Sequence, residues 1–270
     1  TVTDMAKLLD GMVGYDPSDP ITAHGVGRAP ESYADLLDAG ALKGARIGIL
    51  RESMGFRAEP DSDDFHKVSE VFDRAVADLQ TAGAEIVDPV EIPDLKALLA
   101  KRARNSEEED QSFRDYAAGS AGSPFATREE IMASPLFAET CRGVQERWNA
   151  EQADGAYEQY IVARDALMTR FLKVMADHRL DAIVHKAVEH QPTLIKDGLN
   201  PPYYDQRGAP SINTFLVFVP SVVVPAGFTS DDLPAGITFL GRPYDDGSML
   251  RFAYAYEQAT HHRRVPACAP

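Results

Sequence analysis

The sequence is poor in the features that mark secreted and membrane proteins. It contains two cysteines, Cys141 and Cys268, far apart along the chain and too few for a disulfide framework. No apolar run approaches the roughly 18 residues of a membrane span, and we find no signal peptide. We therefore expect reduced thiols, no membrane partner and a cytoplasmic location.

Positive charge is scarce as well. The chain has 27 Lys and Arg against 42 Asp and Glu, which gives a formal net charge of −15 and a pI near 4.8. Such an excess repels nucleic acids and anionic membranes, so we expect neither as a partner. The plainer interpretation of the acidity is that it keeps the surface soluble.

The histidines give little support for a metal site. His261 and His262 are adjacent, so their side chains diverge on a helix. No acidic or cysteine residue completes a ligand set around them at the usual spacing. We expect no bound metal.

Hydrophobic patterns in the first part of the chain predict an α/β fold. Thr3 is the expected cap of a helix that stops at Gly14. Strand-like segments at 46–50 and 84–87 flank a long helix whose Phe65 to Leu79 repeat at helical spacing. A strand, helix and strand of this length imply a right-handed crossover with the helix lying over a sheet.

The second part of the chain continues this alternation. Helices are predicted within 94–178, at 128–133, 136–148 and 155–177, and a strand follows at 181–185. The stretch 215–224 is apolar, β-branched and bracketed by prolines, which indicates a buried strand. A polar turn at 229–232 leads to a second strand at 235–240, and a helix is expected at 249–260. We expect these two strands to form the centre of the sheet.

Two long motifs carry a resemblance. The segments TVTDMAKLLDGMVGYDPSDP and VPSVVVPAGFTSDDLPAGITFLGRPYDDGSMLRFAYAYEQATHHRRVP resemble amidase signature enzymes. The resemblance implies a mixed, mostly parallel β-sheet flanked by helices. It also implies that residues 1–270 form the C-terminal part of a single amidase domain, with residues 94–178 as a helical, substrate-side insertion.

The same resemblance implies hydrolysis of a C–N amide bond through an acyl-serine intermediate, with no metal or organic cofactor. The family uses a serine nucleophile, a second serine in a cis peptide unit and a lysine whose pKa burial lowers enough to make it a base. No equivalents are found here, and Ser120, Ser123 and Ser221 are poor substitutes. This chain is therefore expected to supply scaffold and pocket wall, and to be inactive alone.

Partners follow from that expectation. They are a small-molecule amide substrate and an N-terminal amidase segment on the same or a separate polypeptide; a homo-oligomer is also compatible with the sequence. Two other functions stay open: a degenerate homologue that binds a small amide, a carboxylate or a partner without turnover, and an amidotransferase component of the same family.

His185 and Lys186 are the first candidates for contact with substrate. They end the strand predicted at 181–185, and in an open α/β sheet such a strand end faces the cleft where ligands bind. Either side chain is therefore expected to hold a substrate carboxylate or carbonyl. The alternative is that His185 is a hydrogen-bonded core residue and Lys186 lies exposed.

Asn213, Phe215 and Phe218 are the remaining candidates. The resemblance places the family's Asn at Phe215 and a small residue at Phe218, and it leaves Asn213 out of register. Bulky rings there are expected to narrow an acyl pocket and to favour a flat or apolar substrate. Packing in the core is the alternative for both rings.

Overall fold

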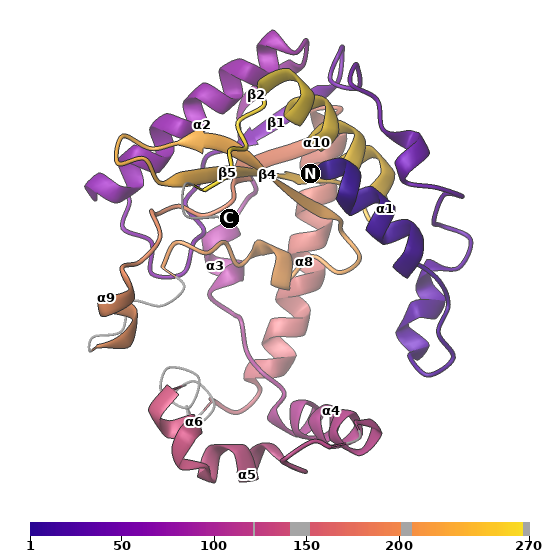
Figure 1. Ribbon diagram of the computed structural model, residues 1–270, viewed down its shortest axis with the longest axis vertical. Helices are drawn as coiled ribbons and strands as arrows, with labels where there is room; N and C mark the ends of the chain where they lie inside the picture. Colours follow the sequence, from indigo (N-terminus) through magenta and orange to yellow (C-terminus); the bar gives the residue numbers. More distant parts are fainter. Residues whose placement is uncertain (121, 141–151, 201–206, 267–270) are drawn as a thin grey trace.

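The structure is a computed structural model that describes the chain except residues 121, 141–151, 201–206 and 267–270 (Figure 1). Its described part contains a five-stranded sheet with the order β2-β1-β3-β5-β4. The strands are β1 (Arg46–Leu50), β2 (Glu85–Val90), β3 (Ala182–Lys186), β4 (Ser221–Phe228) and β5 (Pro234–Leu240). β1 pairs in parallel with β2 and β3, whereas β5 is antiparallel to both β3 and β4. The fold is therefore α/β with a mixed sheet in which only β5 is reversed.

The predicted crossover is present as β1, α2 (Asp63–Thr81) and β2. The hydroxyl of Ser62 accepts a hydrogen bond from the Phe65 N–H, and Asp63 and Asp64 occupy the first turn, where the helix dipole favours acidic groups. One face of α2 is buried against the sheet through Val68, Val71, Phe72, Ala75, Val76 and Leu79. This burial of apolar surface holds the helix on the sheet.

Helices cover both faces of the sheet. α1 (Val2–Met12) and α10 (Asp246–Thr260) lie side by side on the same face as α2 (Figure 1). The other face packs against α3 (Leu95–Leu99) and α8 (Ala156–Asp177). All five residues of β3 are buried, so this strand lies at the middle of the core.

The remaining helices lie away from the sheet. α4 (Ser106–Gly119), α5 (Arg128–Ala133) and α6 (Pro135–Thr140) gather beyond the far end of α8 (Figure 1). α9 (Ile195–Leu199) follows β3, and short 3-10 turns span Pro20–Gly25, Ala34–Leu36 and Ile212–Thr214. The helices predicted at 128–133, 155–177 and 249–260 are confirmed, whereas residues 141–148 of the helix predicted at 136–148 lie outside the described residues. Among the described helices, none combines the length and apolar character needed to cross a membrane.

The prediction of a central strand at 215–224 was wrong. β4 begins only at Ser221, because Phe218 has a positive φ of 60° and Pro220 has no N–H to offer a ladder. β4 is also the last strand of the described sheet, and its burial alternates: Val222 and Val224 are buried while Val223 is 55% exposed. The valine run is therefore a half-covered edge strand, and β3 takes the central place.

The details of the first helix also differ from the prediction. Its cap is Thr1, whose hydroxyl accepts from the Asp4 N–H at 3.1 Å. Val2 and Ala6 are the buried positions, while Leu8 is 62% and Met12 is 69% exposed. Most of the large apolar side chains of this helix therefore point outward.

Replacement of Gly48 in β1 tests the packing of the core. A Cβ at this position lies 2.5 Å from Leu180 Cδ1 and 3.0 Å from Val90 Cγ1, so Gly48→Ala is expected to destabilise the protein by about 1–3 kcal/mol. Gly11→Ala is the matched control, because nothing lies within 4 Å of its Cβ and alanine favours the helix by about 1 kcal/mol. Urea unfolding of both variants measures the difference, and equal stabilities would contradict the described packing.

Candidate functional site

The sheet has a switch point between β1 and β3. The chain leaves β1 through α2 and returns to β2 on one side, whereas β3 pairs on the other side. Ligands of open α/β sheets bind outside the carboxyl ends of the strands at such a point. The loops at 51–62 and 187–191 extend from these two strand ends, and the segment at 207–211 lies against them.

A buried carboxylate ties these loops together. Glu189 is 3% exposed, and it accepts hydrogen bonds from the Met54 N–H at 2.8 Å and from the Ser53 hydroxyl at 2.8 Å. The Glu189 N–H in turn donates to the Gly208 carbonyl at 2.9 Å. Gly208 has φ 73° and its α-carbon lies so close to the next loop that a Cβ would fall 2.7 Å from His190 Cδ2. Glycine is thus required there.

Lys186 is buried rather than exposed. Its ammonium donates to the Ser69 hydroxyl at 2.7 Å and lies 3.7 Å from the centre of the Phe65 ring. Burial lowers the pKa of Lys186, which neighbouring Glu189 and Asp73 partly offset. Ser69 donates its own proton to the Phe65 carbonyl at 2.8 Å, so it is an acceptor for the ammonium and not a nucleophile prepared by a base.

His185 is buried as well, with 2% of its surface exposed. Its Nδ1 lies 2.7 Å from the Lys186 carbonyl oxygen, which can only accept, so Nδ1 carries the proton. Nε2 is then a bare lone pair, and within the described residues it has no partner. Burial lowers the pKa of His185 to about 4, which keeps the ring neutral at neutral pH.

His185 and Lys186 point to opposite faces of the sheet, because successive strand residues alternate. They cannot hold one ligand together. Neither is among the described residues that line the cavities reported below. Contact of either side chain with substrate stays a prediction.

The other sequence candidates lie at the opposite end of β3. The register sets Lys186 beside Ile237 and Val224, but Ile183 beside Leu240 and Ser221. Three residues of strand separate these levels, or about 10 Å. The register therefore places Ser221, to which Asn213 is bonded, at the level of Ile183 and not at the carboxyl end of β3.

Their individual contacts agree with that position. The Asn213 amide donates to the Ser221 hydroxyl at 3.1 Å. Phe215 is fully buried and meets Tyr160 edge-on at 5.0 Å between ring centroids, which is the packing role given above as its alternative. Phe218 is 39% exposed and stacks on Tyr244 at 5.1 Å. The structure does not assemble these residues with His185 and Lys186 into one site.

The substitute nucleophiles gain no support. Ser123 donates to the Phe125 carbonyl at 2.7 Å, and Ser221 accepts from Asn213. No lysine or histidine in the described part of the chain forms a hydrogen bond with Ser120, Ser123 or Ser221, and such a base is what activation requires.

Two cavities flank the loops that Glu189 holds. The first has a volume of about 1100 Å³ and lies between the loop after β1, the end of α3 and the start of α4, and we call it the basic cavity. The charged residues in the described part of its lining are Arg57, Lys96, Arg102, Arg104 and Glu109. The second, of about 760 Å³, is mainly apolar and is lined by ten residues between Ala187 and Leu199, by the middle of β4 and by the start of β5. In the described residues no group of three or more His, Cys, Asp or Glu is arranged to hold a metal ion.

Comparison with known proteins now decides the family. The family model described as Amidase matches residues 1–250. This chain belongs to the amidase signature family.

Amidase relatives extend well beyond the region that matches. A probable amidase from Arabidopsis thaliana is 26% identical over 98% of this chain and 48% of its own length. A glutamyl-tRNA(Gln) amidotransferase subunit from Levilactobacillus brevis is 28% identical over 98% of this chain and 55% of its own. The chain thus spans about half the length of the curated relatives it matches.

Solved amidases share the fold. The peptide amidase of Stenotrophomonas maltophilia has a TM-score of 0.66 at 26% identity, covering 98% of this chain and 53% of that structure. An amidase family protein of Bacillus anthracis has a TM-score of 0.69 at 20% identity, covering 98% and 48%. The expected amidase fold is confirmed.

Sequence reasoning missed the residues that organise this amidase crevice. No sequence motif marks Glu189, Ser53 or Ser69, because each forms a hydrogen bond with a partner more than 100 positions away. Ser69 also donates a hydrogen bond within its own helix. One signal was available for Glu189. It stands close after an entirely apolar strand core, and an acidic residue so near a buried strand needs a partner.

Glu189→Gln tests whether this carboxylate holds the loops together. The variant keeps the shape but loses the charge, so the hydrogen bonds to Met54 and Ser53 weaken and the protein is expected to lose about 1.5–3 kcal/mol. Exchange of the Met54 amide hydrogen is expected to accelerate. Glu129→Gln, at an exposed position of α5, is the control. Unchanged exchange at Met54 would show that the carboxylate does not hold this loop.

His185 predicts a pH dependence of stability. Its folded pKa of about 4 lies below the reference value of 6.5, so between these pH values the unfolded chain binds a proton that the folded chain does not. The contribution of the neutral His185 ring to the free energy of unfolding is fully present above pH 6.5. It falls as the pH drops, by about 2.5 kcal/mol between pH 7.5 and 4.5. His185→Asn keeps a donor near Nδ1 without a titrating ring.

Urea unfolding at pH 7.5 and 4.5 gives the free energy of unfolding of the original protein and of His185→Asn. The effect of His185 is the change with pH in the difference between these two free energies. The carboxylates titrate in both proteins and cancel in that difference. His66→Gln, at an exposed position of α2, is expected to behave as the original protein. A pH-independent difference would contradict the burial of a neutral ring.

Proposed function

We propose that this chain is the scaffold and pocket-wall half of an amidase that hydrolyses a small-molecule amide. A serine oxygen from the other half of the domain attacks the amide carbonyl carbon, the C–N bond breaks, and the amine leaves with a proton. Water then cleaves the acyl-serine ester and releases a carboxylate and the free serine. The charge that develops on the carbonyl oxygen needs fixed hydrogen-bond donors, which also come from the other half.

The observation that carries the proposal is the match of residues 1–250 to the amidase family in a chain that spans half of its relatives' length. Two features of the described residues support it. The cavities lie at the carboxyl ends of β1 and β3, where substrates of α/β enzymes bind. The serines at 120, 123 and 221 have no base beside them in the part that the structure describes.

The open edge of the sheet is the surface on which we place the N-terminal amidase segment. β4 ends the described sheet, and the side chain of Val223 is 55% exposed on it. α1 adds an exposed apolar stripe of Met5, Leu8 and Met12, spaced for one helix face. Apolar burial stabilises by about 25 cal/mol per Å², so an interface of about 1600 Å² or more would outweigh the costs of association. We expect a tight complex or a single continuous domain.

One alternative is the amidotransferase branch of the family. It is favoured by the glutamyl-tRNA(Gln) amidotransferase subunits among the relatives, at 24–28% identity. The net charge of −15 argues against direct contact with RNA, which a further protein would then have to make. Glutaminase activity that rises in the presence of charged tRNA would distinguish this function from plain amide hydrolysis.

The other alternative is a homologue that binds an amide or a carboxylate without turnover. This alternative is favoured by the absence, among the described residues, of a base hydrogen-bonded to Ser120, Ser123 or Ser221. An upstream coding sequence without a lysine and a Gly/Ser-rich stretch with paired serines would support this interpretation against the enzyme.

Amide hydrolysis by the chain alone and together with the upstream segment tests the proposal. We expect no turnover of aryl or aliphatic amides by the chain alone, because no described serine is prepared for attack, and turnover once the segment is added. Catalysis is measured as amine release. Turnover by the chain alone, or none by the combined protein with any amide, would contradict the proposed function.

A further inference from the structure

We propose that the basic cavity selects an amide whose acyl part ends in a carboxylate; this inference rests on the proposed amidase function. Among the described residues, the cavity is lined by the cationic Arg57, Lys96, Arg102 and Arg104 and by the carboxylate of Glu109. The chain as a whole has a net charge of −15 and repels anions. A local excess of cations in a concave site favours the binding of an anion there.

The acidic residue in the described part of the lining is already neutralised. Glu109 accepts from Arg104 Nε at 3.0 Å and from Arg128 Nη1 at 3.0 Å, and the hydrogen bonds of Arg104 are the main cause that lowers its pKa. Arg128 also pairs with Asp110 at 2.9 Å. Glu109 therefore stays ionised with its charge matched, and it contributes little repulsion toward an incoming anion.

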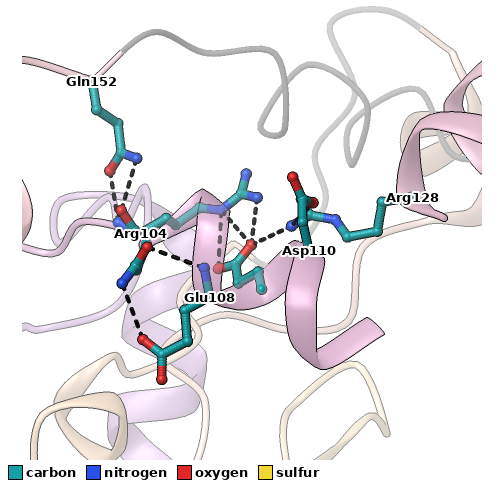
Figure 2. A network of polar contacts seen from close by, with 7 residues as sticks. Arg104, Glu108, Asp110, Arg128 and Gln152 are labelled. Atoms are coloured by element: carbon teal, nitrogen blue, oxygen red, sulfur yellow. Dashed lines mark hydrogen bonds and ion pairs between the residues drawn. The ribbon is translucent and has the colours of Figure 1, made fainter. Parts of the chain in front are cut away.

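The same network fixes the wall of the cavity. The Gln152 amide closes on the backbone of Arg104, accepting from its N–H at 2.6 Å and donating to its carbonyl at 2.9 Å (Figure 2). Asn105 caps α4 by accepting from the Glu108 N–H at 3.2 Å. The short link from α3 to α4 is thus held in one conformation, and a prepared wall loses less entropy when a ligand binds.

Lys96 and Arg102 are the cations left for a ligand. Both lie at or just after α3 and are exposed. Neither side chain forms a hydrogen bond or an ion pair with another residue of the part that the structure describes. Glu52 interacts electrostatically with Lys96 but does not line the cavity.

The rest of the lining describes the body of the ligand. Met54, Leu99, Ala100, Ala209 and Pro210 give the cavity apolar surface beside the cations. An apolar acyl chain that ends in a single carboxylate satisfies both parts, since an Arg or Lys bound to a carboxylate makes a strong charge-assisted hydrogen bond. We therefore name the substrate class as monoamides of short dicarboxylic acids.

A matched pair of chromogenic amides tests this selectivity in the complete enzyme. N-(4-nitrophenyl)succinamic acid and N-(4-nitrophenyl)butanamide release the same amine and differ only in the terminal carboxylate. We expect kcat/KM to favour the succinyl compound about 10-fold or more, since one charge-assisted hydrogen bond carries a factor of this size. The preference is expected to shrink as salt is raised, because these side chains are exposed.

The double variant K96Q/R102Q is expected to reduce the succinyl-to-butyryl ratio to about 2 or less. Lys101→Gln is the matched control, because Lys101 lies between the two cations in sequence, donates to Gln159 at 3.2 Å and does not line the cavity. Its ratio is expected to equal that of the original protein. Equal rates for both compounds in the original enzyme, or an unchanged ratio in K96Q/R102Q, would overturn the inference.

The inference and the proposed function fail differently. Hydrolysis of both compounds without preference would leave the amidase function standing and remove the carboxylate selectivity. If the enzyme hydrolyses neither compound, calorimetric titration with glutarate tests the anion site without catalysis. Binding to the original protein that is weakened about 10-fold in K96Q/R102Q would support the site. No binding of glutarate to the original protein would refute it.

Discussion

The carboxylate of Glu189 is the group on which the crevice depends. It is buried at the switch point of the sheet and fixes the loop after β1 through Met54 and Ser53. A buried carboxylate is costly unless hydrogen bonds and a positive charge compensate it. Here the hydrogen bonds come from Ser53 and Met54 in the loop after β1, and the nearby positive charge comes from Lys186. Because the buried carboxylate requires these partners, it fixes their positions.

The two residues at the end of β3 then take separate roles. Lys186 extends toward α2 and contacts Ser69 and Phe65, while His185 faces the other side with its ring neutral. Both are buried strand residues at the base of the crevice. The cations that remain available to a ligand lie farther out, on the wall formed by α3 and the link to α4.

The sequence was informative where one physical effect dominates. The crossover of β1, α2 and β2 followed from helical spacing between apolar segments, and α5 began and ended at the predicted residues. The placement of β4 failed, because apolar content cannot distinguish a central strand from an edge strand whose outer face another part of a domain covers. Phe215 shows a similar ambiguity, because the sequence alone does not distinguish a ring that lines a pocket from one that packs in the core, and here the ring is buried against Tyr160.

The candidate site depends on long-range contacts, which local patterns do not reveal. Glu189 meets a hydroxyl 136 positions away, and Gln152 meets the backbone of Arg104 across 48 positions. Resemblance supplied what these patterns could not, namely the family and its chemistry. The charge of the cavity needed the fold, because Lys96, Arg102 and Arg104 form a cavity wall only together with the loop after β1 that carries Arg57.

We propose that the catalytic serine of the amidase domain lies outside this chain. An organophosphonate that reacts only with activated serines tests it when it is applied to the complete enzyme and the labelled peptide is found by mass spectrometry. We expect a label on a serine outside these 270 residues and none within them. A label on Ser120, Ser123 or Ser221 would contradict it.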